Sequence, residues 1–152
     1  MTRHRRAFSL AELVLIVLIL AVMAFVAVPK MQFATLRRQK ADAAARKIAT
    51  DLKLTRRLAV CNAAVNVDGY ALWMQGGPPY TQYRIRNLAT LDWVDLRDID
   101  PDVSCTGGSR FEFGPLGNLL AGSDSLLTVS AEGKSFTITV VSATGAVKCI
   151  DN

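Results

Sequence analysis

The sequence predicts an α+β protein in which a long N-terminal helix packs on an antiparallel β-sheet head. Residues 8–28 contain no Lys, Arg, Gly or Pro, and residues 31–59 again contain no Gly or Pro. Both stretches favour one continuous helix that begins near Phe8 and ends near Val60. After Cys61 the hydrophobic period changes to two and turn residues become frequent, which is typical of short antiparallel strands.

The first half of this helix is apolar enough to be membrane-spanning. At a rise of about 1.5 Å per residue, residues 8–28 match a hydrocarbon core of about 30 Å. Three arginines (Arg3, Arg5 and Arg6) precede the run, and this excess of positive charge orients the N-terminus toward the cytoplasm. We therefore expect a single-pass protein in which residues 8–29 form a transmembrane helix.

One charged residue, Glu12, interrupts the apolar run. A lone charge at the bilayer centre costs about 2.5–3.5 kcal/mol on insertion scales, so a carboxylate here is expected to have a partner. Pro29 stands where the apolar run ends. It removes one helical hydrogen bond and can kink the helix without ending it, because helix-favouring sequence follows at once.

Residues 30–60 are expected to continue the helix as an amphipathic and strongly basic segment. They carry nine Lys or Arg residues against Asp42 and Asp51. Lys47, Asp51, Lys53 and Arg57 are expected on its polar faces. One apolar stripe at spacings of three or four is expected to face the head: Ala41, Ala45, Ile48, Leu52, Thr55 and Ala59.

Residues 61–152 are expected to form the β-rich globular head. Asp68-Gly69 is a hairpin signal between the first two expected strands. The head holds six basic and ten acidic residues, so the net positive charge of the chain does not by itself indicate nucleic-acid binding. The expected strands cover residues 65–67, 70–74, 80–86, 91–96, 103–105, 110–113, 126–130, 135–142 and 146–150.

The sequence does not predict an enzyme, a cofactor or a metal site. The only histidine is His4, in the basic leader, and no nucleophile–base pair, phosphate loop or metal-ligand spacing is present. The three cysteines lack CxxC spacing. If the head lies outside the cytoplasm, a disulfide between Cys105 and Cys149 is one arrangement, with Cys61 left free.

Two further features of the head have a structural and a ligand-binding interpretation. Residues 98–102 are expected to form a solvated acidic turn; the alternative is a calcium site, although Val103 stands where an EF-hand loop needs Gly. Four aromatic residues are expected to pack in the core or across strands, with stacking on a ligand as the alternative. They are Trp73, Tyr80, Tyr83 and Trp93.

The N-terminus resembles the leader of type IV prepilins. The resemblance covers about residues 5–30: a basic leader, the small residue Ala7, then Phe8, Glu12 and Pro29. In that family a prepilin peptidase cuts after the small residue, usually Gly, and methylates the new N-terminal amine. Carried over, residues 1–7 are a cleaved leader and the cut falls between Ala7 and Phe8. An ordinary secretory signal peptide and an uncleaved anchor are the alternatives.

Such a cut gives Glu12 a partner. It creates a positive amine on Phe8, about one helical turn from the carboxylate of Glu12. In a bundle of such helices the carboxylate of one chain can pair with the amine of its neighbour, which removes the cost of burying either charge alone. The pair would also set the axial step between subunits, since apolar packing in lipid gives little register.

The head resembles the H-type minor pseudopilins of type II secretion and the related FimT-like minor pilins. The resemblance lies in the phrase FEFGPLG at residues 111–117 and in the Gly145 turn before the final strand. It implies a structural subunit of a periplasmic pseudopilus or a type IV pilus, anchored in the bacterial inner membrane with a periplasmic head. Its partners would be the prepilin peptidase, other pilins or pseudopilins, and the inner-membrane assembly platform.

Two alternatives remain within this resemblance. One is a major filament subunit. The other is a DNA-binding minor pilin, because some FimT-like relatives bind DNA through a basic motif near the final strand. Residues 145–148 hold a single cation, Lys148, and the acidic head repels phosphate, so nucleic-acid binding is not expected. It would be favoured if the head arginines clustered in space: Arg84, Arg86, Arg97 and Arg110.

Overall fold

The computed structural model describes the backbone of residues 10–152 and the side chains of residues 10–25 and 33–152. The chain divides into two compact units, Met1–Leu36 and Arg37–Asn152. One helix, α1 (Leu10–Cys61), contributes to both units, and every strand belongs to the second. The predicted α+β class is confirmed. Pro29 lies within the bounds of α1.

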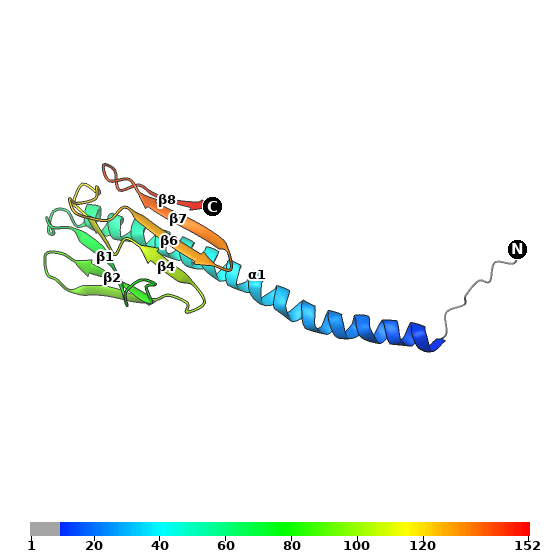
Figure 1. Ribbon diagram of the computed structural model, residues 1–152. Coiled ribbons are helices and arrows are strands. Elements are labelled where there is room, and N and C mark those ends of the chain that lie inside the picture. The colour runs from blue at the N-terminus through cyan, green and yellow to red at the C-terminus, as the bar shows by residue number, and fades with distance from the viewer. Residues whose placement is uncertain (1–9) are drawn as a thin grey trace, which may run out of the picture. The chain divides into compact units, whose positions relative to one another are not determined.

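The head contains two antiparallel sheets of four strands each, where the sequence predicted one sheet (Figure 1). The first sheet has the order β3-β2-β1-β5 and the second β4-β6-β7-β8. β4 and β5 are separated by only two residues, and a turn at Gly107, with φ of +112°, carries the chain from one sheet to the other. The strands are β1 (Tyr70–Gln75), β2 (Gln82–Asn87), β3 (Trp93–Asp98), β4 (Ser104–Gly107), β5 (Arg110–Phe113), β6 (Leu126–Ala131), β7 (Lys134–Val140) and β8 (Val147–Asp151).

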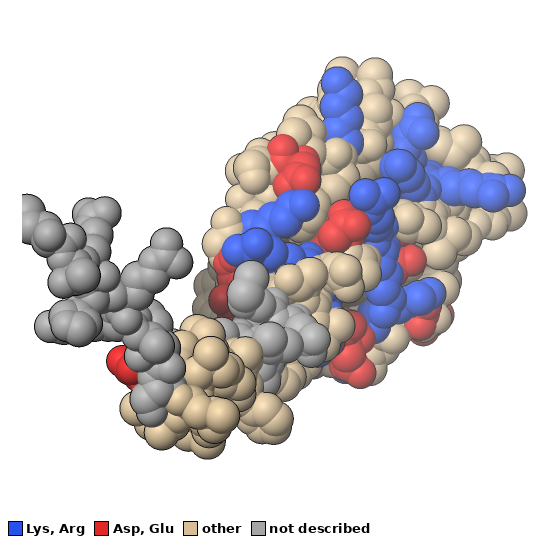
Figure 2. Space-filling view, turned by 90° about the vertical axis from the view of Figure 1, so that its right-hand side faces the viewer, with Lys and Arg blue, Asp and Glu red and all other residues tan. Residues whose placement is uncertain are grey.

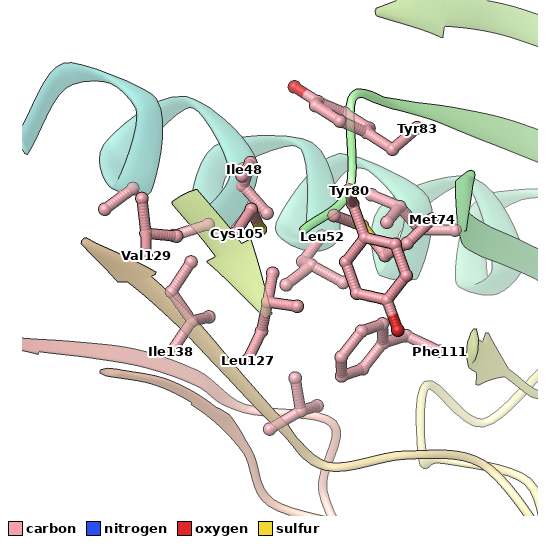
Figure 3. Packing of buried hydrophobic residues seen from close by; sticks show 14 of the residues in the cluster. Ile48, Leu52, Met74, Tyr80, Tyr83, Cys105, Phe111, Leu127, Val129 and Ile138 are labelled. Carbon is pink, nitrogen blue, oxygen red and sulfur yellow. The ribbon is translucent and has the colours of Figure 1, made fainter. Parts of the chain in front are cut away.

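The predicted stripe of α1 forms the centre of the core. All six of its members are buried, and Leu52 is 0% exposed. Ile48 and Leu52 contribute to the same hydrophobic cluster as side chains from both sheets, among them Phe111 and Leu127 (Figure 3). The C-terminal part of α1 thus joins the two sheets through one core, which is why an apolar stripe at helical spacing could be identified from the sequence.

The predicted strand at residues 65–67 is wrong. The chain forms a turn after α1, and Val65 and Val67 are exposed. Asn66 is buried instead: its side-chain oxygen accepts a hydrogen bond from the Gly69 amide and its Nδ2 donates to the Gly69 carbonyl, both at 2.8 Å. The Asn66 side chain thus forms hydrogen bonds with nearby backbone groups that would otherwise pair with a neighbouring strand. Asp68-Gly69 therefore ends this turn and does not join two strands.

Candidate functional site

The described N-terminal part of α1 is an exposed apolar surface with one charge. Every side chain from residue 10 to residue 25 is exposed, including Leu10 at 82% and Phe25 at 85%. Glu12 lies in the first turn of the helix. The structure therefore places the carboxylate on an uncovered apolar surface.

The other predicted processing residues are described only in part. Ala7 and Phe8 lie outside the described residues, and Pro29 lies within α1 without a described side chain. In the part of the chain that the structure describes, no helical stretch has both the length and the hydropathy needed to cross a membrane.

The acidic loop after β3 binds cations from α1. Lys40 Nζ lies 2.6 Å from Asp102 Oδ2 and 3.1 Å from Asp100 Oδ2, and these hydrogen bonds raise the pKa of Lys40. The Asp102 backbone amide, followed by Lys40, lowers the pKa of Asp100. The predicted solvated turn is therefore an ion-paired one. Figure 2 shows Lys and Arg side chains beside Asp and Glu side chains on this side of the molecule.

A second ion pair joins α1 to the turn between β6 and β7. Arg37 Nη1 lies 2.7 Å from Glu132 Oε1, and Arg38 Nε donates to the Glu132 carbonyl at 3.2 Å. Exposed pairs of this kind are each worth about 0–1 kcal/mol. The contacts of Arg37, Arg38 and Lys40 therefore set the position of α1 against the loops of the head, and they add little to the free energy of unfolding. Among the described residues, no group of three or more His, Cys, Asp or Glu side chains is arranged to hold a metal ion.

Asp51 was expected on a polar face of α1, but it is buried. The Tyr83 hydroxyl donates to Asp51 Oδ2 at 2.6 Å, and Arg97 Nε lies 3.7 Å from the same oxygen. Burial, followed by the bond to Asp51, raises the pKa of Tyr83. The burial of Asp51 could not be predicted from the residues around it in the sequence, because both of its partners lie on strands far along the chain. The arrangement satisfies a buried carboxylate within the core.

The structure contains Cys61, Cys105 and Cys149 as free thiols. Cys105 lies on β4 and Cys149 on β8, the two edge strands of the second sheet, with β6 and β7 between them. Strands about 4.8 Å apart place these edges roughly 14 Å from each other, while a disulfide needs a Cα separation below about 7 Å. The disulfide considered for Cys105 and Cys149 is therefore not formed here.

Burial of Cys105 predicts a loss of stability at high pH. Desolvation raises the pKa of its thiol from 9.0 to about 12. Between these values the unfolded thiol loses its proton and the folded one keeps it, so the free energy of unfolding falls as pH rises, by about 1.4 kcal/mol per pH unit. We expect Cys105→Ala to remove this slope between about pH 9 and pH 10, below the ordinary pKa of tyrosine. Urea unfolding of the full chain in detergent with reductant, followed by tryptophan fluorescence, measures it.

The matched control is Cys61→Ala, which removes an exposed thiol from the end of α1. Because this variant keeps the buried thiol of Cys105, it should retain the slope. An unaltered slope in Cys105→Ala would show that the thiol of Cys105 ionises equally well in the folded and unfolded chain.

The glycine turns that carry the resemblance of the head meet at Arg56 of α1. Arg56 Nε donates to the Gly117 carbonyl at 3.0 Å and to the Thr144 carbonyl at 3.1 Å. Gly145 has φ of +62°, and a Cβ on it would meet the Gly117 carbonyl oxygen. Gly117 of the phrase at 111–117 and Gly145 of the final turn thus approach each other closely, and both lie against the Arg56 side chain.

We expect Gly145→Ala to destabilise the head by at least about 2 kcal/mol, because it adds overpacking to a strained φ. Gly122→Ala is the control: its φ is +85°, but nothing lies within 4 Å of an added Cβ, so it should cost only about 1 kcal/mol. Urea unfolding of both variants measures the difference. Equal losses would show that φ strain alone, and not the contact with Gly117, requires glycine at 145.

The outer side of the first sheet carries an alternating array of arginine and tryptophan side chains, which we name the Arg–Trp face. Trp73 on β1 lies opposite Arg84 on β2 and opposite Arg110 on β5, and Arg86 lies opposite Trp93 on β3. Residues directly opposite each other in an antiparallel sheet share a face. The five side chains therefore project together, on the side away from the core. The members of the Arg–Trp face are Trp73, Arg84, Arg86, Trp93 and Arg110.

Guanidinium groups lie over both tryptophan rings. The Cζ atom of Arg86 is 4.9 Å from the ring centre of Trp73 and 5.1 Å from that of Trp93. Arg110 lies 5.2 Å from the Trp73 ring and Arg84 lies 5.3 Å from the Trp93 ring. The two rings meet edge to face, with centres 5.9 Å apart. Each distance is within the range of a cation–π interaction.

The hydrogen bonds of this array are incomplete. Arg110 donates from Nε and Nη2 to Glu112 Oε1, both at 2.6 Å, and Arg86 Nε donates to the Leu91 carbonyl at 3.0 Å. Arg84 Nε and Trp73 Nε1 are buried atoms without a hydrogen-bond partner among the described residues. An unsatisfied buried donor is uncommon and costly.

Three of the four head arginines considered in the sequence therefore cluster. Arg97 does not join them, because it lies opposite Tyr83 and contacts Asp51 and Asp95 on the core side. No pattern in the sequence indicated that Glu112 is a buried partner of Arg110. The one signal in the sequence for this cluster was the spacing of Arg84 and Arg86, since residues two apart on a strand share a face. Of the aromatic residues, Tyr80 and Tyr83 are buried in the core as expected.

No known protein family, curated protein or solved structure matches this chain.

Proposed function

We propose that this chain is a structural subunit, a minor pseudopilin or pilin, that assembles through its N-terminal helix into the periplasmic pseudopilus of a type II secretion system or into a type IV pilus. In this proposal residues 1–7 are removed by a prepilin peptidase and Phe8 becomes a methylated N-terminus. The first half of α1 anchors the subunit in the inner membrane, and the assembly platform brings it together with other pilins.

One observation carries the proposal: an uncovered apolar helix surface with a single carboxylate. The apolar side chains of residues 10–25 are exposed, so they require either lipid or other helices around them. Glu12 among them requires a counter-ion in either setting. A neighbouring subunit with a free amine at Phe8 supplies both the apolar surface and the positive charge. The prepilin-like order of Ala7, Phe8, Glu12 and Pro29 supports the same arrangement.

A photo-crosslinking amino acid placed at Val17 tests this assembly. Val17 is 56% exposed on the apolar surface, so activation in native membranes should capture proteins that carry the same N-terminal pattern, identified by mass spectrometry. Val65, an exposed residue of the head, is the control position and should not give the same captured set. Capture of lipid alone at Val17 would indicate a plain membrane anchor.

The DNA-binding alternative has weaker support. Lys148 lies on β8 of the second sheet, while Arg84, Arg86 and Arg110 lie on the first sheet, so the cations near the final strand and the clustered arginines belong to different sheets. Non-specific binding to DNA depends on the sum of cationic contacts along one path. Residues 145–148 themselves contribute one cation, Lys148, and the Nε of the neighbouring Arg56 is engaged by the Gly117 and Thr144 carbonyls.

A further inference from the structure

We infer that the Arg–Trp face is a docking surface for an acidic, extended segment of a partner protein. This goes beyond the proposed assembly, which depends on the N-terminal helix. It assigns a partner of stated chemistry to the outer side of the first sheet.

The charge of the face favours an anionic partner. It holds three arginines, and the nearby carboxylate of Glu112 is engaged by Arg110. Among the described residues, no carboxylate lies within ion-pair distance of Arg84 or Arg86. The stacked tryptophans hold these guanidiniums in place, so little side-chain entropy is lost when they bind. Arg84 also has a buried Nε without a partner.

The arrangement of the arginine and tryptophan side chains on this face favours a protein segment over a nucleic acid as the ligand. Single-stranded nucleic acids bind by stacking bases on free aromatic rings, whereas the rings of Trp73 and Trp93 have guanidiniums over them. Tryptophan and arginine are the side chains most enriched at the energetic centres of protein–protein interfaces.

The edge of the sheet fits an extended chain. β3 is an edge strand of the first sheet, and its exposed apolar residues Val94 and Leu96, at 53% and 48%, flank the array. Arg84 and Arg86 are two residues apart on β2, or about 7 Å, which is the spacing of alternate side chains in an extended peptide. Carboxylates at alternate positions of such a segment can meet both guanidiniums, and its apolar residues can cover the rim.

A second copy of this chain does not supply this segment. The acidic run of the chain has Asp100 and Asp102 bound to Lys40, and Asp102 also lies 3.9 Å from Arg37. Asp124 is engaged too, since it accepts hydrogen bonds from the backbone amides of Ser109 and Arg110. The run of this chain with carboxylates at alternate positions, residues 98–102, is therefore largely engaged within the chain, and we assign the segment to a different protein.

The test uses the full chain in a zwitterionic detergent and three fluorescein-labelled probes of equal length. These are a peptide of alternating Glu and Val, the same peptide with Gln in place of Glu, and oligothymidylate. We expect the Glu peptide to bind about tenfold or more tightly than the Gln peptide, because it alone offers carboxylates to Arg84 and Arg86. Fluorescence anisotropy gives the three dissociation constants.

Matched variants locate the site. Arg84→Gln and Arg86→Gln should each weaken binding of the Glu peptide about tenfold, while Arg57→Gln, which removes the same charge from an exposed face of α1, should leave it unchanged. Circular dichroism checks the fold of each variant. If a variant unfolds, the comparison of the Glu and Gln peptides on the unmodified chain still tests the proposal. Equal binding of both peptides, or no binding, would overturn the proposal. Tighter binding of oligothymidylate, lost in the same two variants, would overturn it in favour of a nucleic-acid site.

Discussion

Glu12→Ala is expected to reduce incorporation of this chain into filaments by about a hundredfold or more. Removal of one partner from a buried ion pair costs about 3–5 kcal/mol, because the other charge is left uncompensated, and here that charge is the amine of the neighbouring Phe8. The same substitution removes a penalty of about 2.5–3.5 kcal/mol for inserting the helix. The variant should therefore enter the membrane at least as well as the natural chain and yet fail to assemble.

Intact membrane insertion together with reduced filament assembly would distinguish loss of the Glu12–amine pair from a general defect in folding or insertion of the variant. Membrane extraction measures insertion, and recovery of the chain in sheared filaments measures assembly. Val14→Ala, a substitution on the same exposed surface, is the matched control and should change neither by much. Normal assembly of Glu12→Ala would remove the carboxylate from the mechanism, and so would a parallel loss of insertion and assembly.

Leu52→Ala is expected to lower the free energy of unfolding of the head by about 2–5 kcal/mol, because it leaves a cavity in a core that cannot fully collapse. Leu52 is 0% exposed at the centre of the stripe that packs on both sheets. Native proteins are stable by only about 5–15 kcal/mol, so this is a large share of the total. Urea unfolding followed by the fluorescence of Trp73 and Trp93 measures it.

The control lies two positions further along the same helix. Leu54 is 38% exposed, so Leu54→Ala changes the same residue type with a similar effect on helix propensity and should cost less than about 1 kcal/mol. Similar losses for the two variants would mean that α1 does not present Leu52 to the sheets.

The sequence predicted the local features of the fold well. The buried stripe of α1 followed from a spacing of three and four, and turn residues located the strands of the head to within a few positions. The division into two sheets could not be predicted in the same way, because strand pairing is a non-local property. β4 pairs with β6 and β5 pairs with β1, although only two residues separate β4 from β5.

The features of the head that bear on function depended on register. Arg84, Arg86 and Arg110 were named as residues that would matter if they clustered, but only the pairing of β1 with β2 and β5 places them on one face. The burial of Asp51 was missed for a related reason. Its partner Tyr83 lies on β2, and sequence spacing contains no information on a contact of that kind.

The mass of the native protein is the most direct test of the central claim, that this chain is a processed filament subunit. Intact-mass and N-terminal peptide analysis of protein extracted from native membranes should find Phe8 as the first residue, with a methylated amine. A chain that still carries Met1 to Ala7, or one that begins near Phe25, would contradict the account. In the first case Glu12 would have no neighbouring amine with which to pair, and in the second Glu12 itself would be absent from the mature chain.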